Sequence, residues 1–408
     1  GRIGTSGDVL VTLEQDTTDM NNWMAPENTQ LTAEIFAELV SGGHYVNVHS
    51  QSNASGEIRG QILTDNFVLA TFKLDGEQQV PAIDTQAMGS GYALINTDDL
   101  SVEMKVVTSG VESATAAHIH TGRVGANGDV LVSLSQSMDD SNVWMADSGL
   151  TLDAETFATL ASGGHYVNIH SEQFASGELR GQILTDNFVL ATFSLDGEQQ
   201  VPSITTNTSA DGYALVNTDS FATEVTVITK DVDNATAAHI HTGRIGENGG
   251  VLAALVQSDS DSSVWKTEAG LMIDAETLAV LASGGHYVNV HTSLHESGQL
   301  RGQILTDNYA LITFSLNGEQ EVPAIASLAT GDGYALVNTN DYSLELKVVT
   351  EGVADATAAH IHTGRARENG PVLAALVQSS MDNNIWMSAA DLKIDAVDQI
   401  KNTIQEKK

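Results

Sequence analysis

The sequence predicts an all-β protein built of tandem Greek-key β-sandwich domains, each with one short helix. The first observation is an internal repeat of 121 residues, the interval that separates Trp23, Trp144, Trp265 and Trp386. A period of this length is the size of one globular domain and too long for one turn of a solenoid. The second observation is that each period holds several short segments in which apolar and polar residues alternate, separated by Asn, Asp and Gly.

The repeat divides the chain into four units. Two are complete, at 67–187 and 188–308, and we expect each to fold as one domain. The segment 1–66 corresponds to the back part of a unit, and 309–408 corresponds to the front part. The last segment departs from the repeat at "NTIQEKK", where the other units have "SGGHYVNVH" or a close variant.

Each predicted element follows from a local pattern. The stretch "FVLATFSLDGEQQVP" at 188–202 alternates and then stops at a proline, which predicts a strand. The stretches "GYALVNT", "TEVTVIT", "DVLVSLSQ" and "HYVNIHS" predict further short strands. Asp153 before "AETFATLA" is a favourable helix N-cap and Gly163 a favourable stop, and Asp274 and Asp395 repeat the cap.

Composition excludes several classes of function. The chain has 53 acidic and 17 basic residues and a formal net charge of -36, which argues against nucleic acid and anionic membranes as partners. It has no cysteine, so disulfides and thiolate chemistry are excluded. No stretch approaches the roughly 20 apolar residues of a membrane-spanning helix.

The histidines are the candidate functional residues, because 12 of the 13 fall in two repeated motifs, "HIH" and "HYVNxH". Residues two apart on a strand face the same side, so the two imidazoles of each "HIH" project together. A third imidazole from the end of "HYVNxH" would complete a three-nitrogen metal site, and imidazole suits copper and zinc. The alternative is a structural role in which the rings bond backbone carbonyls. The predicted ligands are His118, His120 and His170, His239, His241 and His291, His360 and His362, and His49.

Two other features carry weaker predictions. The acidic loops before the tryptophans, such as "SMDDSNVW", offer oxygen ligands for calcium, although a solvated turn explains them as well. Arg59, Arg180 and Arg301 recur in "RGQIL" and are predicted to lie near the histidine sites. The alternative is an ion pair with a neighbouring carboxylate such as Glu57 or Glu178.

The motifs "LDGEQQVP", "TAAHIHTG" and "LASGGHYVNIHS...ASGELRGQIL" together resemble the CHRD domain, named after chordin. The resemblance covers 67–306 as two full domains, with partial copies at both ends. It implies an extracellular or cell-surface protein. A more distant resemblance to copper/zinc superoxide dismutase implies that His118, His120 and His170 would be copper ligands and Arg180 a nearby cation. His239, His241, His291 and Arg301 would follow in the next unit. That enzyme's zinc-binding loop has no counterpart here.

The partial units predict self-association. A truncated sandwich exposes a sheet edge and apolar core, and the first segment carries the strands that the last lacks. We expect copies to join head to tail into a filament or matrix. Closure within one chain, and an excerpt of a longer array, are the alternatives. Two other functions compete with this structural one, a copper-only, dismutase-like surface enzyme and an adhesin or ligand-binding array.

Overall fold

The structure, a computed structural model, describes residues 1–394. The helix predicted after Asp395 and the divergent "NTIQEKK" lie outside these residues. The described chain forms two compact units. One holds Gly1–Leu74, Ala87–Thr121 and Asp129–Asp186, and the other holds Asp75–Gln86, Gly122–Gly128 and the chain from Asn187 onward.

The first complete repeat is one sheet of eight strands, in the order β12-β11-β8-β9-β10-β7-β6-β5. The bounds are β5 Phe67–Leu74, β6 Met88–Asn96, β7 Val102–Ser109, β8 Ala114–Thr121, β9 Val130–Gln136, β10 Val143–Met145, β11 His165–Ser171 and β12 Leu179–Gln182. From β7 the chain crosses to β8, three positions along the sheet, and returns through β9 to β10, which pairs with β7. This path is a Greek key. A bridge between Ala70 and Thr185 brings the two sheet ends together, which gives the predicted all-β domain a barrel-like form.

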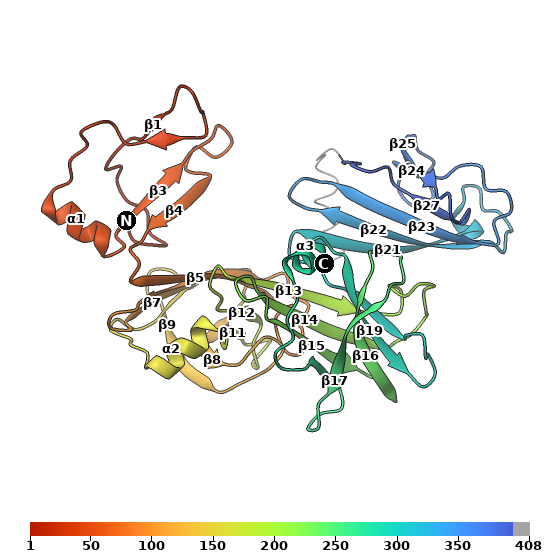
Figure 1. The fold of residues 1–408 in the computed structure, drawn as a ribbon, viewed down its shortest axis with the longest axis horizontal. Helices are drawn as coiled ribbons and strands as arrows, with labels where there is room; N and C mark the ends of the chain where they lie inside the picture. Colours follow the sequence, from red (N-terminus) through yellow and green to blue (C-terminus); the bar gives the residue numbers. More distant parts are fainter. Residues whose placement is uncertain (395–408) are drawn as a thin grey trace. The chain divides into compact units, whose positions relative to one another are not determined.

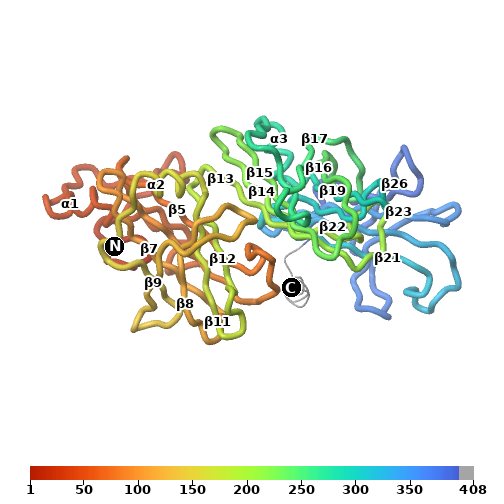
Figure 2. Tube along the Cα trace, turned by 90° about the horizontal axis from the view of Figure 1, so that it is seen from below, coloured from red at the N-terminus to blue at the C-terminus, as the bar shows by residue number. Residues whose placement is uncertain are grey.

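The second complete repeat has the same topology, in the order β13-β14-β15-β18-β17-β16-β19-β20. The bounds are β13 Phe188–Leu195, β14 Ser209–Asn217, β15 Thr223–Lys230, β16 Ala235–Thr242, β17 Val251–Gln257, β18 Val264–Thr267, β19 His286–Thr292 and β20 Leu300–Gln303. Its sheet ends meet at the bridge between Asp196 and Arg301. Figure 1 labels most of these strands, and Figure 2 follows the chain from below.

The flanking segments form smaller sheets. Residues 1–66 give β1 Glu14–Gln15, β2 Trp23–Met24, α1 Ala33–Val40, β3 His44–Val48 and β4 Ile58–Ile62. Residues 309–394 give β21 Tyr309–Asn317, the 3-10 helix Gly318–Gln320, β22 Thr330–Asn338, β23 Leu344–Glu351, β24 His360–His362, β25 Val372–Ala375, β26 Val377–Gln378 and β27 Ile385–Met387. The longest strands here, β21, β22 and β23, lie side by side in one five-stranded sheet.

Each complete repeat carries one short helix, as the sequence predicts. Helix α2 is Ala154–Ala161 and α3 is Ala275–Ala282. The side chain of Asp153 accepts a hydrogen bond from the backbone N–H of Thr156, and Asp274 does the same for Thr277. These are N-caps, and they satisfy amide groups that have no partner within the helix.

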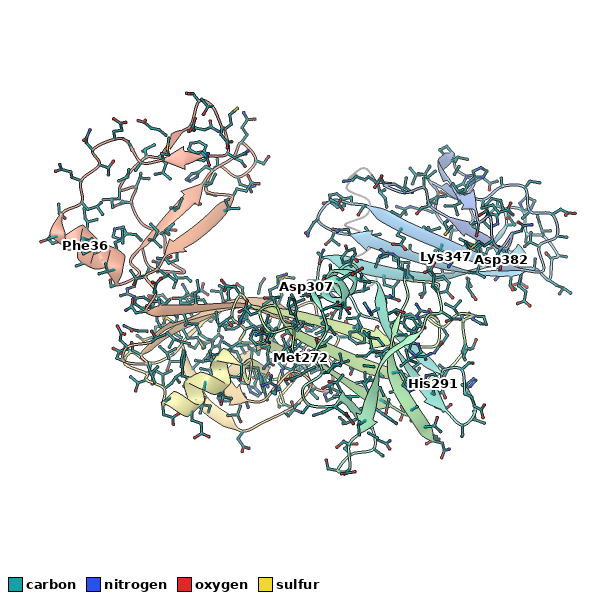
Figure 3. All side chains as sticks on the ribbon, viewed as in Figure 1. Phe36, Met272, His291, Asp307, Lys347 and Asp382 are labelled. Carbon is teal, nitrogen blue, oxygen red and sulfur yellow. The ribbon has the colours of Figure 1, made fainter. Side chains whose placement is uncertain are left out.

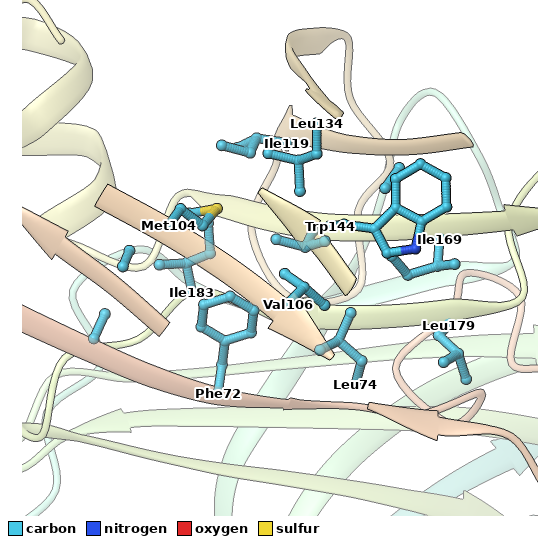
Figure 4. Packing of buried hydrophobic residues seen from close by; sticks show 14 of the residues in the cluster. Phe72, Leu74, Met104, Val106, Ile119, Leu134, Trp144, Ile169, Leu179 and Ile183 are labelled. Carbon is cyan, nitrogen blue, oxygen red and sulfur yellow. The ribbon is translucent and has the colours of Figure 1, made fainter. Parts of the chain in front are cut away.

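The core of each repeat fixes the direction in which the histidine strands face. In the first complete repeat, Trp144, Val106, Ile119 and Ile169 pack together with other buried apolar residues (Figure 4). Because side chains alternate along a strand, the inward direction of Ile119 leaves its neighbours in "HIH" on the other face of β8. Burial of the apolar residues therefore orients the imidazoles.

Candidate metal centre

The imidazoles of each complete repeat come from two adjacent antiparallel strands. In the second repeat His239 lies opposite Asn289 and His241 lies opposite Tyr287, in the pairing of β16 with β19. His291 follows two residues after Asn289 and so shares its face. His291 is the next-to-last residue of β19 and is labelled in Figure 3. The predicted convergence of the "HIH" pair with the downstream histidine is therefore present in the structure.

The nitrogens of the three rings lie close to one another in both complete repeats. In each group, His118, His120 and His170 or His239, His241 and His291, one nitrogen per ring lies within 4.8 Å of the others. His118 Nδ1 is 3.1 Å from His170 Nε2, and His239 Nδ1 is 3.1 Å from His291 Nε2. We call these two groups the histidine triads.

Backbone carbonyls set the tautomers of two rings in the second repeat. His241 Nδ1 is 3.0 Å from the carbonyl oxygen of Gly249, and His291 Nδ1 is 2.9 Å from that of Glu296. A carbonyl only accepts, so each Nδ1 carries the proton and each Nε2 keeps its lone pair. Nε2 of His241 is buried and has no hydrogen-bond partner. Most buried polar atoms have hydrogen-bond partners, and a metal held by the triad would give this one a partner.

Burial and neighbouring imidazoles favour the neutral form of three of the triad rings. Burial lowers the pKa of His239, and the nearby His291 and His241 lower it further. Burial also lowers the pKa of His241, although its hydrogen bond to Gly249 opposes the shift. The pKa of His118 is lowered by burial and by His170 and His120. Neutral imidazole is the form that binds a metal.

The donor set fits a transition metal. Two nitrogens that bind one metal at tetrahedral positions, about 2.0–2.1 Å from it, lie roughly 3.3 Å apart. The 3.1 Å separation between His239 Nδ1 and His291 Nε2 is close to this value. Three imidazoles suit copper or zinc, and three protein ligands leave one coordination position free. A metal-free alternative is a direct hydrogen bond between the same two rings.

The other histidines of the motifs are placed differently. His165 and His286, the first residues of "HYVNxH", are buried and belong to neither triad. His360 and His362 have ring centroids 5.8 Å apart, so the third "HIH" pair also projects together. His49 Nδ1 lies 3.0 Å from the carbonyl oxygen of Ala54. Within residues 1–394, neither this pair nor His49 belongs to a group of three.

The arginines have a structural role that the sequence left open. The guanidinium of Arg301 lies 3.6 Å above the Tyr287 ring and donates to the carbonyl oxygens of Arg244 and Glu247. Arg59 likewise lies over Tyr45 and uses carbonyl oxygens of residues 2 and 5 rather than the neighbouring carboxylate. Arg180 lies over Tyr166.

The charge of Arg301 is retained despite its burial. Burial lowers the pKa of its guanidinium to about 10, against the opposing influence of Tyr287, Tyr334 and Glu247. Arg301 therefore stays charged at neutral pH. It supports the loop beside the triad by donating to two backbone carbonyl groups of that loop and to the side-chain oxygen of Gln303.

Two parts of the site were not predicted from the sequence. One is the stacking of His241 on Tyr287, with ring centroids 5.0 Å apart. The other is a cavity of about 240 Å³ beside His241, lined by Val201, Pro202, Asn289 and seven further residues. The signal for both was the pattern of alternate residues on β19, which places Tyr287 and Asn289 on the face of the triad.

The acidic loops use carboxylates to stabilise turns. The Asp140 side chain accepts from the backbone N–H of Asn142, and Asp261 accepts from that of Ser263. Such local hydrogen bonds are typical of Asx turns. Calcium binding by these loops stays a prediction.

Comparison with known proteins also divides the chain into four repeated units. The model of the CHRD domain matches residues 1–62, 70–183, 191–304 and 312–406. Chordin from Xenopus laevis is 27% identical over 259 residues, which cover 58% of this chain and 26% of that protein. The chain thus spans about a quarter of this relative's length. No solved structure matches. No helix among residues 1–394 is long and apolar enough to cross a membrane. Because four matches account for most of its length, the chain belongs to the CHRD domain family.

Proposed function

We propose that the protein is an extracellular structural repeat protein that holds copper-type metal ions in its histidine triads and associates with its own copies. The family and the likeness to chordin support an extracellular location. The acidity of the chain favours a strongly hydrated surface in such a setting. The observation that carries the metal proposal is the buried Nε2 of His241, which has no hydrogen-bond partner and belongs to a ring that lies close to two further imidazoles.

Copper titration of the metal-free protein tests the triads. We expect about two tightly bound copper ions per chain, one for each triad of the described residues. His118→Gln and His239→Gln should each remove one. The control is His295→Gln, because His295 lies outside both motifs. Binding that survives both triad substitutions, or that falls equally in the control, contradicts the proposal.

Self-association is supported by exposed apolar side chains in the flanking segments, because the equivalent side chains in the complete repeats are buried. Ile58 in β4 is 64% exposed, whereas Leu179, its counterpart in β12, is fully buried. Leu316 in β21 is 37% exposed, whereas Leu195 in β13 is fully buried. In the complete repeats these two strand types face each other where the sheet closes. We propose that β4 of one copy meets β21 of another, and that repetition of this contact forms a filament or matrix.

Sedimentation over a range of protein concentrations tests the contact between copies. We expect assemblies that grow with concentration, and Ile58→Glu or Leu316→Glu should keep the protein monomeric. Met138→Glu is the matched control, since Met138 is fully exposed in a loop of a complete repeat. A monomer at all concentrations would support closure within one chain instead, and would refute the filament.

One observation favours a second function, that of a dismutase-like enzyme. The cavity beside His241 would let a small molecule reach a metal held by the triad. Arg301, however, is fully buried and bound to carbonyl groups, so it is not available to attract an anion. A superoxide assay of the copper-loaded protein distinguishes the two functions. Turnover that disappears in His239→Gln would favour the enzyme.

A further inference from the structure

The loop Gly243–Gly250 is attached to the histidine triad at one end. His241 Nδ1 donates to the carbonyl oxygen of Gly249, and the backbone N–H of Gly249 donates to the Tyr287 hydroxyl at 3.1 Å. Tyr287 is the residue on which the His241 ring stacks. The ring of one proposed ligand and the end of this loop are therefore fixed by the same contacts.

Arg301 in β20 holds the middle of the loop by hydrogen bonds. Its guanidinium donates to the carbonyl oxygens of Arg244 at 3.0 Å and Glu247 at 2.7 Å. Gln303 donates to the carbonyl oxygen of Gly243 at 2.9 Å. Charged donors in a buried site give stronger hydrogen bonds than neutral ones, so these bonds attach the loop firmly to β20.

The outer side of the loop contacts the sheet of the following repeat. Arg244 Nε donates to the Glu345 carboxylate at 2.9 Å. Ile245 is 3% exposed and packs in a small apolar cluster with Leu305, Tyr334 and Leu336. We call these contacts between the loop and the β21–β23 sheet the junction.

The junction recurs along the chain. Arg2 donates to Glu103, Arg123 to Glu224 and Arg244 to Glu345, and each pair is 101 residues apart. A second contact beside the junction also recurs, because the hydroxyl of Tyr213 donates to the carbonyl oxygen of Gln79 and the hydroxyl of Tyr334 donates to that of Gln200. Because equivalent residues form these contacts in successive units, the contacts are a property of the repeat.

We propose that the loop Gly243–Gly250 couples metal binding at the triad of His239, His241 and His291 to the junction with the following repeat. This inference rests on the proposed metal function. A metal fixes the His241 ring, the ring fixes the carbonyl group of Gly249, and the fixed loop presents Arg244 and Ile245 to the next sheet. Coupling of this kind is reciprocal: the factor by which a bound metal stabilises the junction equals the factor by which the intact junction raises metal affinity, so loss of the junction must lower metal affinity.

Copper affinity of junction variants tests the coupling. The experiment uses the full chain with His118→Gln, so that the triad of the second complete repeat is read alone by competition with a chromophoric chelator. Ile245→Ala and Leu336→Ala weaken the junction from its two sides without changing charge. We expect each to lower the affinity for Cu²⁺ about fivefold or more. Tyr334→Phe, which removes one hydrogen bond, should give a smaller decrease.

The control is Leu346→Ala, because Leu346 lies in the core of the last repeat and outside the junction cluster. It should keep the copper affinity within twofold. Hydrogen exchange gives a second readout, since Cu²⁺ should protect the amides of β22 in the parent chain but not in Ile245→Ala. Tight copper binding that is equal in all variants overturns the coupling alone. Failure of the parent chain to bind copper overturns the metal function, and the coupling with it.

Discussion

Gly212→Ala is expected to destabilise the second complete repeat although alanine is the smallest side chain that can be added. Gly212 in β14 lies directly opposite Phe193 in β13, and the phenyl ring covers the glycine. A Cβ atom at residue 212 would lie 2.2 and 2.4 Å from two ring atoms of Phe193. Carbon atoms in contact normally stay about 3.5–4.0 Å apart, so the ring would have to move by more than roughly 1 Å.

The magnitude follows from two opposing effects. Forcing a packed aromatic ring out of place costs about 1–3 kcal/mol. Replacing glycine by alanine at a compatible backbone conformation stabilises a protein by about 0.4–1 kcal/mol, because the unfolded chain loses freedom. We expect a net loss of about 1–2 kcal/mol, which corresponds to a five- to thirtyfold change in the folding equilibrium.

Gly250→Ala is the matched control in the same repeat. A Cβ atom at Gly250 would meet nothing within 4 Å, so only the favourable effect on the unfolded chain remains. Hydrogen exchange of the β13 and β14 amides measures both variants in the full chain. Protection should fall about five- to thirtyfold in Gly212→Ala and hold or rise in Gly250→Ala. A stabilised Gly212→Ala, or equal losses in both variants, would refute the packing argument.

Further predictions concern the tryptophans, pH and metal. In the monomeric chain Trp265→Ala should lower the free energy of unfolding by about 3–5 kcal/mol, because Trp265 is 5% exposed. Trp23→Ala should lower it far less, because Trp23 is 46% exposed. Thermal unfolding of the two variants measures the difference. Burial lowers the pKa of His286 in the folded protein. As the pH falls below about 6.5, His286 therefore binds a proton more readily in the unfolded chain than in the folded one. Stability should therefore fall as the pH drops below about 6.5, and denaturation of His286→Gln should show a shallower pH dependence. Copper at 100 times its Kd should raise the unfolding free energy of a triad-bearing repeat by about 2.7 kcal/mol, and a chelator or His291→Gln should abolish the increase.

Much of the fold could be predicted because local signals and tertiary packing agree. Alternation along "HYVNIH" puts His170 on the same face as Tyr166 and on the opposite face from His165, because side chains two residues apart on a strand share a face. Asp153 correctly marked the start of α2 because its side chain caps the first turn. The prediction that "HIH" converges with the downstream histidine needed one further condition, that β8 pairs with β11, and the structure meets it.

The role of the arginines could not be predicted, because it depends on a loop far away in sequence. Arg301 contacts carbonyl groups 54 and 57 residues earlier, and nothing in "RGQIL" indicates them. The same holds for Gly212, whose cross-strand ring lies in another element. Short-range patterns specify faces and ends of strands, whereas such contacts depend on how the strands are ordered in the sheet.

The recurring junction has a consequence for how such a protein changes over time. Each complete repeat offers an arginine to the unit after it and a glutamate to the unit before it, and the paired residues are always 101 positions apart. Inserting or deleting one whole unit therefore leaves the remaining contacts with their original partners. The number of repeats can therefore change by duplication without requiring a new interface. An insertion or deletion of a few residues between the paired arginine and glutamate, in contrast, would disturb their contact.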